Sequence, residues 1–185
     1  MIVFRAVLIA LLAWWTARLG SGAQQGCFLD LVNLAFHEAG HLFFSPFGTT
    51  MHFLGGTLGQ LLVPAGLAVY FVKARQEPFA AAACAWWLGE SLVNISVYMS
   101  DARDLALPLV GGGDHDWNNL FYAFGLLGQE SVAAVSAWTH RCGTIVMVLG
   151  LAWLATFLLT GESRRRFESA IEARIPILRR LVSAE

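Results

Sequence analysis

The sequence predicts an all-α integral membrane protein with about five transmembrane helices and one further interfacial or re-entrant helix. Of its 185 residues, 57% are hydrophobic and only 14% are charged, whereas soluble domains usually carry about 25% charged residues. The mean hydropathy is +0.59. The apolar residues fall in runs close to the length of about 20 residues that a membrane-spanning helix needs. We therefore expect the chain to lie in a membrane, specifically the inner membrane of a bacterium.

The first apolar run, residues 2–19, is expected to be a spanning helix. The adjacent Trp14 and Trp15, close to Arg18, are typical of the interfacial end of such a helix. A cleaved signal peptide is the alternative interpretation, because Arg5 precedes the apolar run and small residues follow it. The bulk of the tryptophans at the expected cleavage region favours the spanning helix.

The next two apolar runs are expected to be helices over 28–44 and 51–72. Pro46 ends the first of them. The second contains Pro64, which can kink it, and several glycines that would let it pack closely against a neighbour. His52 opens this second run and is interpreted as an interfacial residue rather than a ligand.

A fourth spanning helix is expected over 79–100, and its polar residues lie on one face. Glu90, Asn94 and Asp101 follow each other at intervals of four and seven residues, which is the spacing of one helical face. Such a polar stripe on a membrane helix should face the interior of the bundle or a cavity.

The remaining chain contains the longest polar break, over 101–116, and two further expected helices. Residues 117–140 are less apolar and are interpreted as the interfacial or re-entrant helix. Residues 143–159 are expected to be the last spanning helix, after which an arginine cluster at 164–166 begins a mixed tail. The expected organisation is a polytopic membrane domain over 1–160 and a short basic cytoplasmic tail over 161–185.

The basic residues suggest how the helices cross the membrane. Five spans put Arg18, Lys73 with Arg75, and the cluster at 164–166 on the cytoplasmic side, as the excess of positive residues in cytoplasmic loops requires. The N-terminus and the region 101–140 would then lie on the outer side.

The chemistry is concentrated in the segment that contains His37, Glu38 and His41. Two histidines four residues apart lie one above the other on a helix and can bind one divalent ion, while the glutamate can reach a water on that ion. This H-E-x-x-H pattern is typical of zinc peptidases, in which the glutamate is the general base. Because burying these groups in an apolar helix is costly unless they bind something, the sequence predicts a Zn²⁺ site with Glu38 as its catalytic residue.

A catalytic zinc site usually has three protein ligands, and the sequence leaves the third open. His115 is favoured, because it follows the Gly111-Gly112-Gly113 bend that could fold it back onto the motif helix. Asp116 beside it, Asp101 and Glu90 are the alternatives. Glu90 resembles the zinc-binding glutamate that follows the same motif on a later helix in thermolysin-like peptidases.

The motif within an apolar helix, followed by the glycine-bearing stretch from Gly55 to Gly59, resembles the site-2 protease family of intramembrane zinc metallopeptidases. This resemblance covers about residues 28–72 and carries over His37, Glu38 and His41. The family also implies a later Leu-Asp-Gly motif, and its nearest match here has Val110 in place of the aspartate.

The predicted function is hydrolysis of membrane-associated protein or peptide substrates by metal-activated water, with membrane lipid as the surrounding partner. A membrane metal-binding or metal-transport protein is one alternative, with the polar stripe lining a path. A peptidase-derived scaffold that does not cleave is the other. The net charge of −1 and the lack of a basic stripe exclude nucleic acid as an expected partner.

Overall fold

The computed structural model describes residues 2–23, 26–109 and 114–159, and this part of the chain is all-α. Two short 3₁₀ turns, Ser45–Phe47 and Thr156–Leu158, extend helices. The six α-helices in the described residues are α1 (Ile2–Gly20), α2 (Asp30–Phe44), α3 (Thr49–Lys73), α4 (Pro78–Ser100), α5 (Asp116–Ala123) and α6 (Gln129–Ala155).

Three helices in the described residues are long and apolar enough to cross a membrane: α1, α3, and α6 together with the turn that follows it. The second expected span is shorter than the sequence indicated. As α2 it has 15 residues, or about 22 Å of helix, which is less than the thickness of about 30 Å of a bilayer core. The fourth expected span, α4, is long enough with 23 residues but is less apolar than these three helices.

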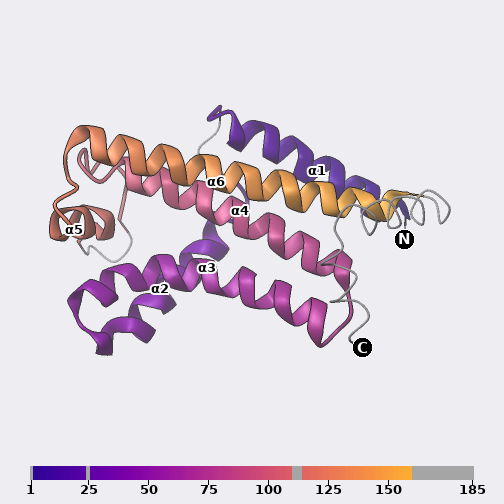
Figure 1. Cartoon of the computed structure of the whole chain (residues 1–185), viewed down its shortest axis with the longest axis horizontal. Helices are drawn as coiled ribbons and strands as arrows, with labels where there is room; N and C mark the ends of the chain where they lie inside the picture. The colour runs from indigo at the N-terminus through magenta and orange to yellow at the C-terminus, as the bar shows by residue number, and fades with distance from the viewer. Residues whose placement is uncertain (1, 24–25, 110–113, 160–185) are drawn as a thin grey trace, which may run out of the picture.

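The long helices lie side by side, with α4 packed between α6 and α3 (Figure 1). Glycines bring α4 and α6 together, since a Cβ on Gly143 would come within 2.7 Å of the Gly89 carbonyl oxygen. A hydrogen bond from Trp86 Nε1 to Thr16 Oγ1, 2.8 Å long, joins α4 to α1 in the buried core.

One helix boundary expected from the sequence is wrong. The ranges 117–140 and 143–159 were expected to be separate helices, whereas α6 runs without a break from Gln129 to Ala155. The break lies earlier, where Gly125 has a φ of +69° and ends α5. Gly143 does not interrupt α6, because its missing side chain allows close contact with α4.

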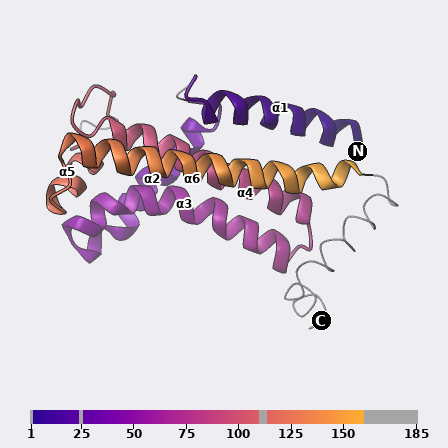
Figure 2. The same ribbon diagram turned by 45° about the horizontal axis from the view of Figure 1, so that its top comes forward.

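The direction of α1 also differs from the expected arrangement. Arg5 lies 4.9 Å from the ring centroid of Phe79 and 5.9 Å from that of Phe157, so the start of α1 is beside the start of α4 and the end of α6. Figures 1 and 2 show α1 and α6 antiparallel, with α5 at the opposite end of the bundle. The N-terminal end of α1 is therefore remote from the region 101–140, with which it was expected to share a side. The arginine cluster at 164–166 and the expected tail over 161–185 are outside the described residues.

Candidate metal centre

The two motif histidines lie one turn apart on α2 and converge. Their ring centroids are 4.7 Å apart, and the two Nε2 atoms are 3.0 Å apart. His41 Nδ1 donates a hydrogen bond of 2.7 Å to the backbone carbonyl oxygen of His52. Because a neutral imidazole carries one ring hydrogen, this bond leaves the Nε2 lone pair of neutral His41 free for a metal ion.

The third atom of the cluster comes from Asp116, the first residue of α5. Its Oδ2 lies 2.9 Å from His37 Nε2 and 3.2 Å from His41 Nε2, and the residue is 4% exposed. Bonds of 2.0–2.2 Å at tetrahedral angles separate zinc ligands by about 3.3–3.6 Å. The observed separations are a few tenths of an ångström shorter, so these three residues fit a metal ion with only a small movement.

The charge of Asp116 also fits this role. Burial acts to raise the pKa of its carboxyl group, but the neighbouring His37 and His41 imidazoles outweigh burial and hold the pKa below its ordinary value. The residue therefore carries its charge at neutral pH. An ionised carboxylate is the form that binds a metal ion.

A glycine on α3 makes room for the cluster. A Cβ on Gly56 would lie 2.5 Å from His37 Cε1, 2.6 Å from His37 Nε2 and 2.7 Å from His41 Nε2. Both ligand nitrogens thus lie directly against the α3 backbone, in space that any other residue would fill. The sequence identified this glycine only as a packing residue. Gly56 follows His52 by one helical turn, and this spacing is the feature of the sequence that could have placed it beside the histidines.

His37, His41, Asp116 and Glu38 line one cavity of about 880 Å³. No hydrogen bond or ion pair holds the Glu38 carboxylate among the residues that the structure describes, so it is free to act on a group inside the cavity. The other polar lining comes from α2, α3, α4 and the start of α5, and the apolar lining is Leu31, Leu34, Phe53, Ile95, Leu107, Pro108 and Leu109.

His115, the favoured third ligand, is placed beside the cluster rather than in it. Its Nδ1 accepts a hydrogen bond of 3.2 Å from the Asn118 backbone N–H and caps α5. Its Nε2 lies 3.4 Å from Asp101 Oδ2. The structure therefore brings Asp116 to the two histidines, and His115 and Asp101 to each other.

Glu90, the remaining alternative ligand, lies near the middle of α4, does not line the cavity and is 1% exposed. Its carboxylate accepts hydrogen bonds from Asn33 Nδ2 at 2.9 Å and Cys27 Sγ at 3.3 Å. With Cys27 and Asp30 it forms a second group whose spacing could hold a metal ion. Since the carboxylates of Glu90 and Asp30 both have protein donors, this group is explained as a structural hydrogen-bond network.

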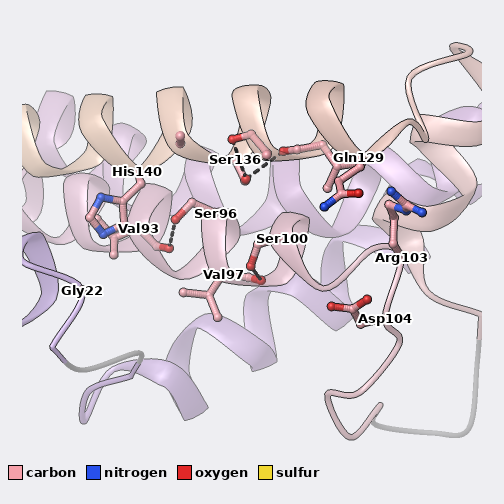
Figure 3. A pocket seen from close by; sticks show the side chains of 13 residues that line it. Gly22, Val93, Ser96, Val97, Ser100, Arg103, Asp104, Gln129, Ser136 and His140 are labelled. Atoms are coloured by element: carbon pink, nitrogen blue, oxygen red, sulfur yellow. Dashed lines mark hydrogen bonds between the residues drawn. The ribbon is translucent and has the colours of Figure 1, made fainter.

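A second cavity, of about 600 Å³, lies between α4 and α6 (Figure 3). Its serines bond within their own helices: Ser96 donates to the Val93 carbonyl oxygen at 2.6 Å, and Ser136 to that of Val132 at 2.8 Å. Neither metal-ligand group found in the described residues lies in it. The cavity around Glu38 is therefore the candidate functional site.

Comparison of the chain with protein-family models, with curated proteins and with solved structures gave no match in any of the three.

Proposed function

We propose that the chain is a membrane-embedded zinc metallopeptidase that cleaves membrane-associated protein or peptide substrates. The observation that carries this proposal is the joint presence of His37, His41, Asp116 and a free Glu38 carboxylate in one cavity. Three ligands leave the fourth zinc position for water, which is the arrangement of catalytic rather than structural sites. The likeness of the motif to site-2 proteases supports the same conclusion.

In this proposal each residue of the centre has one task. A zinc ion held by His37, His41 and Asp116 would lower the pKa of water to about 7. Glu38 would accept a proton from the water that attacks the carbonyl carbon of the scissile amide, and would pass it to the amine as the C–N bond breaks. The His52 carbonyl oxygen holds His41 in the orientation that presents Nε2 to the centre.

The membrane part of the proposal refines the expected five spans. Four helices cross the bilayer, with α1 and α4 running in one direction and α3 and α6 in the other, and α2 enters it beside the first half of α3 without crossing. Large apolar side chains on the outer face of α2, such as Leu42 at 75% and Phe43 at 71% exposure, suit contact with lipid. Lys73 and Arg75 then mark the cytoplasmic end, which in a bacterium is the inner face of the inner membrane.

The metal-transport alternative is less well supported. It requires the polar stripe of α4 to line a path, but of Glu90, Asn94 and Asp101 only Asn94 lines the cavity. Glu90 and Asp101 are hydrogen-bonded to α2 and to the segment after α4 instead. A transporter also has no need for the free carboxylate of Glu38 beside the ligands.

Glu38→Gln tests the proposal. The three ligands are unchanged, so purified protein should keep about one zinc per chain. The proton acceptor is lost, so cleavage should fall by about 10²–10⁴-fold. The readout is a comparison of membrane proteomes from cells that produce the wild type or the variant, scored for membrane proteins that lose a fragment. Glu77→Gln, at the opposite end of the bundle, is the matched control.

Two results would count against the peptidase. Identical fragment patterns in wild-type and Glu38→Gln cells, with zinc retained in both, would favour a scaffold that does not cleave. Metal uptake impaired by changes at Glu90 or Asp101 but not at Glu38 would favour the transporter.

A further inference from the structure

A buried histidine–aspartate pair lies directly behind the third ligand. His115 is 5% exposed, and its Nδ1 accepts the Asn118 backbone N–H. Since a neutral imidazole that accepts at one nitrogen carries its hydrogen on the other, Nε2 carries the hydrogen; this buried nitrogen makes no hydrogen bond, and Asp101 Oδ2 lies 3.4 Å from it. Both nitrogens are thus directed to protein groups other than the metal cluster.

The same Asp101 carboxylate also holds the wall of the cavity. Its Oδ1 accepts the Ala106 N–H at 2.9 Å and its Oδ2 accepts the Leu107 N–H at 3.1 Å. Leu105, between these anchors and α4, has a φ of +51°, a left-handed conformation that a leucine rarely adopts unless its surroundings impose it. Asp101 is therefore the group that fixes this segment, which continues into the cavity lining at Leu107.

We propose that Asp101 and His115 form a positioning pair for the metal centre. By fixing His115 at the start of α5, the pair sets the direction from which Asp116 approaches His37 and His41. Tyr98 completes the support, because its ring lies 4.2 Å from that of His115 and its hydroxyl accepts the Asp116 N–H at 3.1 Å. This inference rests on metal binding in the proposed function, and it does not depend on peptidase activity.

The two ring nitrogens of His115 can be imitated separately. Asn in place of His115 keeps an acceptor near the Nδ1 position and is a good helix N-cap, but it is too short to reach Asp101. Gln reaches about as far as Nε2 and can direct an N–H group toward Asp101. His115→Asn therefore removes the pair while keeping the cap, and His115→Gln restores the pair.

The experiment is a titration of the full-length chain, purified in detergent, with Zn²⁺ and with Co²⁺ against a competing chelator. His115→Asn and Asp101→Asn should each still bind one ion, with affinity lowered about 10–100-fold, as for other groups that orient metal ligands. The double variant should be no weaker than the weaker single variant. The visible Co²⁺ spectrum should change in both, and His115→Gln should recover most of the affinity. Asp104→Asn, an exposed acid on the same segment, is the control and should match the wild type.

Two outcomes would overturn the inference while leaving a metal centre in place. One is loss of the bound ion in His115→Asn together with its retention in Asp116→Ala, which would make His115 the ligand. The other is affinity in His115→Asn and Asp101→Asn equal to that of Asp104→Asn. A wild-type chain that binds neither ion would instead overturn the metal centre, and the positioning role with it.

Discussion

At the scale of single residues, the centre depends on three atoms that can all accept a hydrogen bond or bind a cation. His41 has its hydrogen on Nδ1, where the His52 carbonyl oxygen accepts it, and Asp116 is ionised. Three acceptor atoms within 3.2 Å of one another are an unfavourable arrangement unless a proton or a cation lies between them. A divalent ion satisfies all three atoms together, whereas a proton is shared by two.

Gly56→Ala tests whether this arrangement depends on the space beside α3. The new methyl group would lie 2.5–2.7 Å from atoms of His37 and His41, so both imidazoles must move. We expect metal affinity to fall by at least about tenfold, because ligand positions must be held to about 0.5 Å. Zinc content after dialysis against a weak chelator measures the loss. Gly66→Ala, whose Cβ would meet no atom within 4 Å, should bind like the wild type, and equal zinc in both variants would contradict the role of Gly56.

The sequence was sufficient to predict that His37 and His41 converge, because residues four apart lie one above the other on any helix. It could not choose between His115 and Asp116. These neighbours differ in backbone conformation, since His115 is extended with ψ of 112° and Asp116 is the first helical residue. Their side chains therefore point in different directions, and only the position of α5 against α2 decides which one meets the histidines.

At the scale of elements, α2 is held by polar contacts with α4 rather than by its own length. Asn33 is the centre of these contacts: its Oδ1 accepts from Trp87 Nε1 at 2.8 Å and Ser91 Oγ at 3.3 Å, and its Nδ2 donates to Glu90. The sequence predicted that the stripe with Glu90 would face the bundle interior. The structure adds that Glu90 faces α2, the helix that carries His37 and His41.

Asn33→Ala should therefore loosen α2 without removing a ligand. The change leaves buried partners on α4 unpaired, and each such group costs about 1–3 kcal/mol. We expect a clearly lower midpoint of thermal unfolding in detergent, followed by tryptophan fluorescence, with zinc still bound below the transition. Leu42→Ala, on the exposed face of the same helix, should shift the midpoint much less. Equal shifts would show that the contacts of Asn33 do not hold α2.

The extent of α6 shows where local signals were insufficient. Residues 117–140 were expected to form a helix separate from 143–159 because they are less apolar, but α6 continues through both ranges from Gln129 to Ala155. In the bundle Gly143 allows α6 to contact α4 at Gly89. Packing of this kind depends on a partner helix that local sequence does not reveal.

At the scale of the whole molecule, the helix directions fix where the centre lies. Gly56, which contacts both histidines, is 17 residues before Lys73 on α3, or about 25 Å along the helix. If the Lys73 end is cytoplasmic, the centre lies close to the opposite face of a bilayer core of about 30 Å. Substrates would then approach from the outer side, where α5 and the segment after α4 surround the cavity.

Cysteine labelling of the intact chain separates this topology from the five-span arrangement. The three native cysteines are first replaced (Cys27→Ser, Cys84→Ala and Cys142→Ala). A single reporter cysteine is then introduced at Ile2, Gln76 or Asp104. Right-side-out and inverted vesicles are treated with an impermeant maleimide. Because Arg5 lies beside Phe79 and Phe157, we expect Ile2→Cys and Gln76→Cys to react from the same side and Asp104→Cys from the other. If Ile2→Cys and Asp104→Cys instead react from the same side, the five-span arrangement is supported. That result would contradict the antiparallel arrangement of α1 and α6 in the membrane.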